Sequence, residues 1–240
     1  MIYFQSLTQT DLAALLEPLS RDPKQARYRS KQIFHWVYQR HVLDWNLMSD
    51  LSKAVRAWLI ENVEIMRLKT RFSKQAEDGT HKFLWDLADS KTIESVIIPA
   101  ALKEKGREAF ASSNGVSPRQ EAELMAKGRR FAGQEVEDDL ELTKDNWSRL
   151  TACISSQVGC AMACKFCLTG VQGLDRSLKT EEIVAQVFEL RLHAPITNIV
   201  FMGMGEPLHN LANIIKACRI FVDQDGFGFS KRKVTVSTSG

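Results

Sequence analysis

Cysteine is confined to the second half of this sequence, and its placement constrains the fold more than any other feature does. Four of the five cysteines fall within fifteen positions, at Cys153, Cys160, Cys164 and Cys167. A secreted framework would spread its cysteines to connect distant segments, so this clustering indicates metal binding or redox chemistry. The fold must therefore present a compact cysteine loop at one place.

The last three of these cysteines have a C-x3-C-x2-C spacing. Three thiolates on one tight loop can hold three irons of a [4Fe–4S] cluster and leave the fourth iron open for chemistry. The alternative is a structural zinc with Cys153 as fourth ligand. Zinc sites prefer closely paired cysteines, and the gap from Cys153 to Cys160 is too long for such a pair. The spacing favours the open cluster over zinc.

The composition is that of a globular protein. A hydrophobic content of 44% over 240 residues is enough for a sizeable core and excludes a disordered, collagen-like or disulfide-dense chain. No apolar stretch approaches the roughly 20 residues of a membrane helix. The first residues have no basic region and are interrupted by Asp11 and Glu17, unlike a secretory signal. We therefore expect a cytoplasmic protein without membrane contact, built from one large or two small domains.

Changes in periodicity divide the chain into four expected regions. Residues 1–64 have apolar residues at helical spacing and predict a small basic helical domain. In residues 65–100, apolar and polar side chains alternate with a period of two, which predicts a three-stranded antiparallel meander. Residues 101–146 break this order and predict a mobile insertion with a helix near 117–130. Residues 147–240 follow the order strand, helix, strand, helix, strand.

The fourth region predicts parallel βαβ units, with strands at 150–158, 197–203 and 233–239 and helices at 179–193 and 210–224. The chain is thus of the α/β class, and a site should lie at the carboxyl ends of the parallel strands. The second strand runs into the glycine-rich segment GMGEP, residues 203–207. Glycine lets the backbone approach a ligand closely, and the carboxylate of Glu206 could pair with an ammonium group.

A basic patch lies in the helical region. Between Arg21 and Arg40 there are six basic residues and one acid. Contacts from Lys and Arg to phosphate supply most sequence-independent affinity for RNA, so this patch is a candidate RNA-binding face. The charge alone is explained equally well by a solvated helix face.

Three segments resemble the RlmN/Cfr family of radical S-adenosylmethionine enzymes, which methylate adenine carbons in RNA: CISSQVGCAMACKFCLTGVQGL, NIVFMGMGEPLHN and GFGFSKRKVTVSTSG. The stretches YRSKQIFHWVYQR and DGTHKFLWDLAD resemble the N-terminal region of the same family. The resemblance covers most of the chain except residues 101–146. It implies the first half of a radical-SAM partial (β/α) barrel, preceded by a small N-terminal helical domain and a short antiparallel β meander.

The resemblance also implies roles for individual residues. Cys160, Cys164 and Cys167 would bind the [4Fe–4S] cluster, and Gly205, Glu206 and Ser237 would contact S-adenosylmethionine. Glu94 would accept a proton, and Cys153 would resolve a covalent enzyme–RNA adduct by forming a disulfide. Judged from the residues alone, simpler readings are favoured for three of them: an exposed strand carboxylate for Glu94, a buried strand cysteine for Cys153 and a turn hydroxyl for Ser237.

The chemistry implied by the resemblance is radical methylation of an electron-poor carbon through a methyl group carried on a protein cysteine. The GMGEPL and STSG segments favour C2 of adenine over C8. The implied partners are 23S rRNA, tRNA as a further candidate substrate, and an electron donor for the cluster.

The family's methyl-carrying cysteine lies beyond the end of this sequence, and Cys218, in a helix pattern, fits a core position better. We therefore expect a chain that lacks the family's C-terminal part and gives no turnover by itself. We also expect the protein to be a monomer. The alternative from another class is a non-catalytic iron–sulfur or zinc RNA-binding module.

Overall fold

The computed structural model describes residues 1–102 and 147–239. The expected helix near 117–130 and nearly all of the expected insertion lie outside these residues. The described strands are β1 (Ile2–Tyr3), β2 (Val63–Glu64), β3 (Lys69–Gln75), β4 (His81–Asp86), β5 (Thr92–Leu102), β6 (Trp147–Cys153), β7 (Gln157–Gly159), β8 (Leu174–Ser177), β9 (Asn198–Phe201) and β10 (Val234–Val236). The α-helices are α1 (Gln9–Leu16), α2 (Pro23–Phe34), α3 (Lys53–Asn62), α6 (Leu168–Gln172), α7 (Thr180–His193) and α8 (Leu211–Val222).

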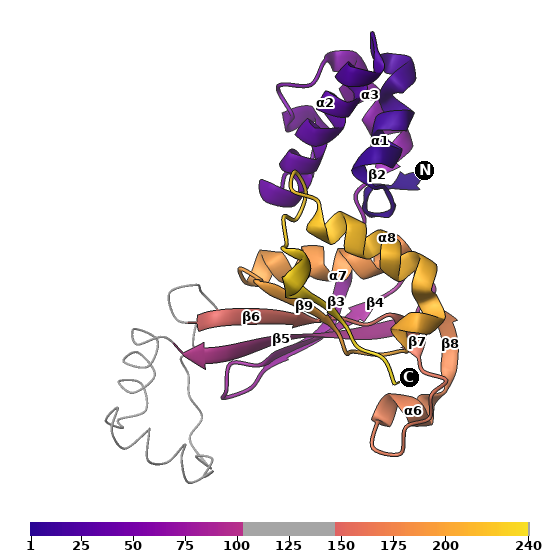
Figure 1. Cartoon of the computed structure of the whole chain (residues 1–240), viewed down its shortest axis with the longest axis vertical. Coiled ribbons are helices and arrows are strands. Elements are labelled where there is room, and N and C mark those ends of the chain that lie inside the picture. Colours follow the sequence, from indigo (N-terminus) through magenta and orange to yellow (C-terminus); the bar gives the residue numbers. More distant parts are fainter. Residues whose placement is uncertain (103–146, 240) are drawn as a thin grey trace.

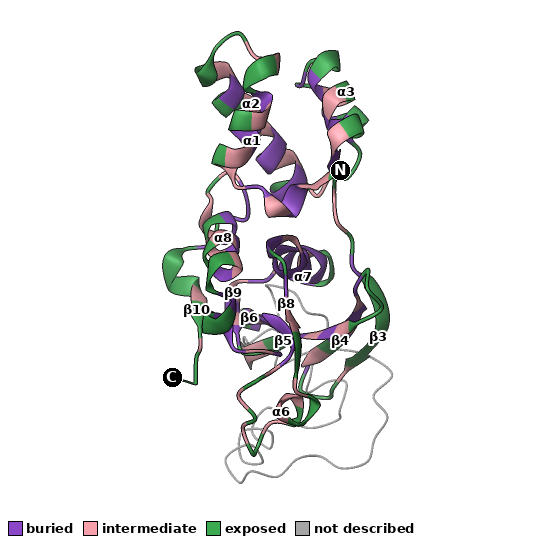
Figure 2. Ribbon diagram, turned by 90° about the vertical axis from the view of Figure 1, so that its right-hand side faces the viewer, coloured by how far each residue is buried: buried purple, intermediate pink, exposed green. Residues whose placement is uncertain are grey.

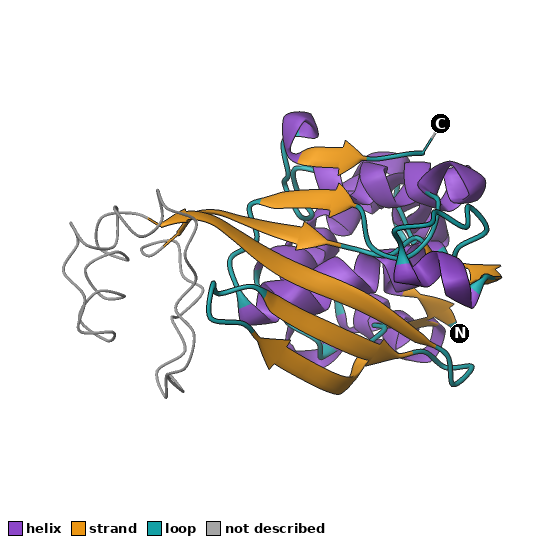
Figure 3. Ribbon diagram, turned by 90° about the horizontal axis from the view of Figure 1, so that it is seen from below, coloured by secondary structure: helices purple, strands orange, loops and turns teal. Residues whose placement is uncertain are grey.

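A six-stranded sheet with the order β10-β9-β6-β5-β4-β3 forms the centre of the molecule (Figure 3). Strands β3, β4 and β5 are antiparallel neighbours, which confirms the predicted meander. Strands β6, β9 and β10 are parallel, and α7 and α8 connect them as the sequence predicts. Because β5 pairs with β6, the meander and the parallel strands belong to one sheet. The boundary expected at residue 100 therefore does not separate two sheets.

The predicted strand at 150–158 is wrong in extent, because the structure divides it between two sheets. Strand β6 ends at Cys153, and β7 pairs with β8 in a separate two-stranded sheet. Two serines lie at the break. The Ser155 hydroxyl donates to the carbonyl of Glu94 (2.6 Å), and the Ser155 amide donates to a helix side chain, Gln186 (2.8 Å). These bonds replace the ladder that a continuous strand would need.

Helices α7 and α8 cover one face of the sheet (Figure 1). Alternate residues of the strands, including Ile93, Ile97, Ile199 and Phe201, are buried toward these helices. Helix α7 is buried along most of its length, because the sheet packs on one side and the N-terminal helices lie on the other (Figure 2). The opposite face carries polar side chains such as Lys82 and Glu94, which form an ion pair.

The N-terminal region is helical, as predicted. Helices α1, α2 and α3 begin at side-chain caps from Thr8, Asp22 and Ser52, and α2 continues into a π-helical turn over His35–Gln39. Short 3-10 helices occur at Phe4–Ser6, Glu17–Leu19, Trp45–Leu47, Pro207–Asn210 and Lys231–Lys233. Among the described residues, no helix is both long and apolar enough to cross a bilayer.

Candidate functional site

The three closely spaced cysteines lie on one antiparallel hairpin. We call β7, β8 and the loop between them, residues 157–177, the cysteine hairpin. It begins just after the carboxyl end of β6, where the sequence predicts the site. The Cys160 amide donates to the carbonyl of Gly173 (2.9 Å), which closes the loop. Gly159 has φ +75°, and a Cβ there would lie 1.8 Å from the Gly173 oxygen, so this closure requires glycine.

The chemistry of the three thiols fits a thiolate-bound cluster. Cys160, Cys164 and Cys167 are unpaired and partly exposed. Hydrogen bonds from the backbone of Gly170 and Thr169 lower the pKa of the Cys167 thiol and favour the thiolate that iron binds. Nevertheless, no three His, Cys, Asp or Glu side chains in the described ranges are gathered closely enough to hold a metal ion. The hairpin therefore supplies a donor set on one loop, and the thiols must converge to bind a cluster.

A second loop packs directly against the start of the cysteine hairpin. We call residues 203–206, which follow β9, the glycine–glutamate turn. The carbonyl of Met204 accepts hydrogen bonds from the Ser156 and Gln157 amides at 2.8 and 3.2 Å. Gly205 has φ +100°, and a Cβ there would lie 2.5 Å from the Gln157 Cβ. Gly205 thus has a structural reason to be glycine in addition to the cofactor contact that the resemblance implies.

Glu206 is a buried carboxylate that joins the ends of two parallel strands. Its Oε1 accepts from the Leu208 amide (3.0 Å), and its Oε2 accepts from the Ser239 amide (3.0 Å) and hydroxyl (3.1 Å). Burial raises the pKa of Glu206, but these hydrogen bonds outweigh burial and lower the pKa to about 2. The carboxylate is therefore ionised at neutral pH, as pairing with an ammonium group requires.

Ser237, the third residue implied to contact S-adenosylmethionine, follows the end of β10 and is partly exposed. Within the described residues it makes no side-chain hydrogen bond, whereas Ser239 contacts Glu206 directly. Sequence reasoning missed Ser239, although the STSG segment that contains it was singled out. It also missed Gln157 and Asn210, polar residues that flank the two motifs.

Glu94 and Cys153 lie on the same face of the sheet. Cys153 is paired with Val96 in the β5–β6 register, and Glu94 is two residues from Val96, so the pleat directs both away from α7. Glu94 is partly exposed and forms an ion pair with Lys82 (Oε1 to Nζ, 2.6 Å). Burial raises the pKa of the Cys153 thiol, opposed by a hydrogen bond from the Met202 backbone. Cys153 is therefore a protonated thiol at neutral pH, and it needs a base to act as a nucleophile.

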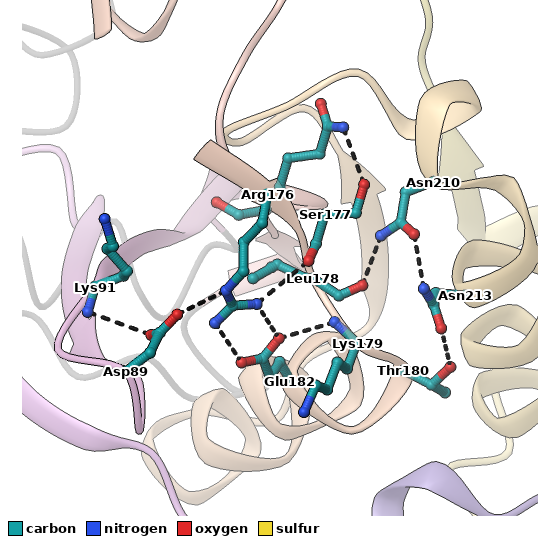
Figure 4. A network of polar contacts seen from close by, with 12 residues as sticks. Asp89, Lys91, Arg176, Ser177, Leu178, Lys179, Thr180, Glu182, Asn210 and Asn213 are labelled. Atoms are coloured by element: carbon teal, nitrogen blue, oxygen red, sulfur yellow. Dashed lines mark hydrogen bonds and ion pairs between the residues drawn. The ribbon is translucent and has the colours of Figure 1, made fainter. Parts of the chain in front are cut away.

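Ion pairs fasten the end of the cysteine hairpin to the rest of the fold (Figure 4). The Arg176 guanidinium, on β8, bonds both carboxylate oxygens of Glu182 at 2.8 Å, and its Nε donates to Asp89 (2.7 Å). These contacts raise the pKa of Arg176, with the bonds to Glu182 as the largest cause. A neighbouring pair, Lys91 and Asp175, also links β8 to the β4–β5 turn. One hairpin strand is thereby tied to both α7 and the meander.

The basic patch has a free part and an engaged part. Arg21, Lys24 and Arg27 are exposed on or just before α2 and have no ion pair within the described residues. In contrast, Arg29 donates to the Leu19 carbonyl (2.6 Å), and Arg40 stacks 4.4 Å from the Trp36 ring centroid. Lys31 pairs with Asp225 (3.6 Å). Three of the six cations are thus engaged within the fold, which leaves three available to a polyanion.

Comparison with known proteins defines the class first. Residues 154–240 match the family model of the radical SAM superfamily, and residues 5–65 match the model of the ribosomal RNA large subunit methyltransferase N-terminal domain. A solved radical SAM methyltransferase from Sphaerobacter thermophilus superimposes with a TM-score of 0.71 at 31% identity, covering 100% of this chain and 57% of that one. The chain is thus a radical SAM protein with the first half of the partial barrel and an N-terminal helical region.

Comparison with curated relatives then identifies the family within this class. The dual-specificity RNA methyltransferase RlmN of Geotalea uraniireducens is 42% identical over 214 residues, which is 89% of this chain and 49% of the relative. The protein of the same name from Halorhodospira halophila is 40% identical over 98% of this chain and 52% of its own length. The chain belongs to the RlmN family. It spans about half the length of the curated relatives it matches.

Proposed function

We propose that this protein serves the methylation of adenine C2 in 23S rRNA, with tRNA as a second substrate. The observation that carries the proposal is the packing of the cysteine hairpin against the glycine–glutamate turn at the carboxyl ends of β6 and β9. Ligands bind at these strand ends in parallel α/β folds. Family membership supports the methyltransferase class, and the GMGEPL and STSG segments favour C2 over C8.

In this proposal, Cys160, Cys164 and Cys167 hold the [4Fe–4S] cluster, while Gly205, Glu206 and Ser237 hold S-adenosylmethionine. Together these groups supply radical chemistry for a carbon too electron-poor for ordinary methyl transfer. The ionised Glu206 accepts hydrogen bonds from the ammonium group of the cofactor. For that contact, its carboxylate must exchange or share the bonds it now makes to Ser239.

Glu94 and Cys153 act on the RNA side of the same site. Glu94 accepts the C2 proton, and it must leave its ion pair with Lys82 to do so. Cys153, as the thiolate, attacks the sulfur of the methyl-carrying cysteine of the family's C-terminal part. The bond from that sulfur to the methylene carbon breaks, the carbon keeps the electron pair and takes up a proton to become the methyl group, and the two cysteines are left as a disulfide. The buried thiol of Cys153 must lose its proton first, which gives this face of the sheet a role in moving protons.

We further propose that residues 1–64 form the RNA-binding part of the protein through the exposed cations Arg21, Lys24 and Arg27. The protein would work as a monomer in the cytoplasm and receive electrons from a separate donor. The second candidate function is a non-catalytic iron–sulfur or zinc RNA-binding module. It uses the same thiols and the same exposed cations, and it differs from the first function in giving no methyl transfer.

The reaction is tested in cells of the source organism. Deleting the gene should remove 2-methyladenosine from nuclease digests of 23S rRNA, analysed by mass spectrometry. An allele with Cys164→Ala should have the same effect, and an allele with Cys218→Ala should not. Unchanged 2-methyladenosine in the deletion strain would contradict the proposal, and loss of 8-methyladenosine instead would move the specificity to C8.

A further inference from the structure

Two buried side-chain amides connect the cysteine hairpin to the loop that holds Glu206. Asn210 ends the short 3-10 helix Pro207–Asn210 that follows the glycine–glutamate turn, and Gln157 is the first residue of β7. Both are almost fully buried, at 5% and 1% exposed. Polar groups buried to this extent stabilise a fold only when they are hydrogen-bonded, so their partners show which segments they hold.

Asn210 joins the two ends of the cysteine hairpin. Its Nδ2 donates to the carbonyl of Ser156 (2.9 Å), just before β7, and to the carbonyl of Leu178 (2.7 Å), just after β8 (Figure 4). The Leu178 amide also donates to the Ser156 carbonyl (3.1 Å). A single amide group therefore spans the base of the hairpin from the segment that carries Glu206.

Gln157 makes a second connection from the hairpin side. Its Oε1 accepts from the Glu206 amide (2.8 Å), and its Nε2 donates to the Ser177 hydroxyl on β8 (3.2 Å). A Cβ at Gly205 would lie 2.7 Å from the Gln157 Cγ, so the glycine–glutamate turn packs directly against the Gln157 side chain. Strand β7 is thus bonded to the glycine–glutamate turn through Gln157, and Leu178, directly after β8, is bonded to Asn210.

We propose that Asn210 and Gln157 are positioning residues that lock the cysteine hairpin to the glycine–glutamate turn, so that the cluster site and the S-adenosylmethionine site form as one unit. This inference rests on the proposed function of those two sites. The hydrogen bonds of Asn210 reach neither the cysteine side chains nor the Glu206 carboxylate. Its effect on the cofactors would be transmitted through the hairpin.

The diagnostic variant is Asn210→Asp, which keeps the shape but replaces the donor that serves two carbonyls. The control is Thr180→Val, which keeps the shape of the side chain. The Thr180 hydroxyl donates to Asn213 Oδ1 (2.9 Å), and Asn213 Nδ2 donates to Asn210 Oδ1 (2.8 Å), so Thr180 belongs to the same network without bonding Asn210 or the hairpin. Because the carbonyls of Ser156 and Leu178 lose their partner only in Asn210→Asp, the two variants separate local linkage from general destabilisation.

Hydrogen–deuterium exchange of the metal-free full chain tests the linkage without any cofactor. In Asn210→Asp, the amides of Cys160, Leu178 and Glu206 should exchange roughly tenfold faster, while Thr180→Val should leave them near the wild-type rate. Unchanged exchange at these amides in Asn210→Asp would overturn the proposal. Should that variant fail to fold, Ser177→Ala, which removes only the Gln157 Nε2 bond, should give a smaller acceleration in the same segments.

The effect of the two substitutions on cofactor binding is measured after anaerobic reconstitution with iron and sulfide. Asn210→Asp should lose iron to a chelator roughly tenfold faster than Thr180→Val and should show a weaker change in the electron paramagnetic resonance signal when S-adenosylmethionine is added. Equal behaviour of the two variants would contradict the positioning role. If the wild-type chain holds no cluster, the proposed function fails, and the exchange measurement still decides the linkage.

Discussion

Glu206 has a structural role in the fold, and the proposed function gives it a ligand as well. Its carboxylate is buried, ionised and held by amides from Leu208 and Ser239. The sequence indicated a carboxylate poised for an ammonium group, and the structure adds that this carboxylate already connects the ends of β9 and β10. Gly205 beside it combines a proposed cofactor contact with a conformation that packing requires.

Glu206 should stabilise the folded chain in a pH-dependent way. Its pKa of about 2 lies below the ordinary value of 4.5, so its contribution is complete above 4.5 and is lost as the pH falls through about 2. Glu206→Gln should reduce the free energy of unfolding by about 2 kcal/mol at neutral pH. In urea titrations the difference from wild type should shrink toward pH 3. The exposed Glu61→Gln is the control, and a pH-independent difference would contradict this assignment.

Gly205→Ala should be more harmful than a matched glycine substitution on the cysteine hairpin. Both Gly205 and Gly173 have positive φ, at +100° and +74°, but only at Gly205 would the new Cβ meet another residue. We expect about 1 kcal/mol of backbone strain at Gly173 and at least about 2 kcal/mol more at Gly205, from urea unfolding. Equal losses would show that packing against Gln157 is unimportant.

At the scale of elements, the cysteine hairpin is held by contacts from outside itself. The loop and α6 expose large apolar side chains such as Phe166 and Leu168, so the hairpin has little core of its own. Its order comes from Asn210 and Gln157 at its base and from Arg176 on β8. A hairpin of this kind is positioned by polar contacts, in contrast to the sheet and helices, which bury apolar faces.

Arg176→Gln should loosen the hairpin from α7. The substitution removes a bidentate partner from Glu182, whose side chain is only 8% exposed, and a buried carboxylate without its cation is costly. We expect a loss of about 2 kcal/mol in urea unfolding, reduced by the bond that the Lys179 amide keeps to Glu182. Lys91→Gln is the control: its pair with Asp175 is exposed on both sides and should contribute little. Comparable losses in the two variants would show that the Arg176–Glu182 pair contributes no more than the exposed pair does.

The sequence was informative where local patterns decide the structure. The meander, the parallel strands and the connecting helices follow from periodicity, and the cysteine loop follows from spacing. The pairing of β5 with β6, however, joins segments with no local signal for each other, so the continuous sheet could not be predicted. Strands β7 and β8 are short and lack alternation, and the roles of Asn210 and Gln157 depend on partners that only the folded chain brings near.

At the scale of the whole molecule, the helical region and the barrel strands share one hydrophobic core. Lys31 pairs with Asp225, Lys216 pairs with Asp11, and Arg67 pairs with the buried Glu189, which join the N-terminal region to α7, α8 and the segment after α8. The face with Arg21, Lys24 and Arg27 is therefore held at a fixed position relative to the strand ends. An RNA held on this face could be presented to the site reproducibly.

Replacing Arg21, Lys24 and Arg27 together with Gln should weaken RNA binding mainly through its salt dependence. Each lost phosphate contact lowers the slope of log affinity against log salt by about 0.7 on single strands, so we expect a decrease of about 2. Filter binding of an rRNA hairpin at several salt concentrations gives the slope. The exposed Lys69 and Lys74, changed to Gln, serve as the control pair. An unaltered slope in the triple variant would show that the RNA binds to another surface of the protein.

The most direct test of the radical SAM assignment is the metal content of the chain after anaerobic reconstitution, with the electron paramagnetic resonance spectrum of the reduced protein recorded with and without S-adenosylmethionine. We expect about four irons per chain, a broad visible absorption band and a signal that changes when S-adenosylmethionine is added, because an open iron binds it. A chain in which Cys160, Cys164 and Cys167 are Ala should show none of these. One zinc per chain, or a four-iron signal indifferent to S-adenosylmethionine, would contradict the assignment.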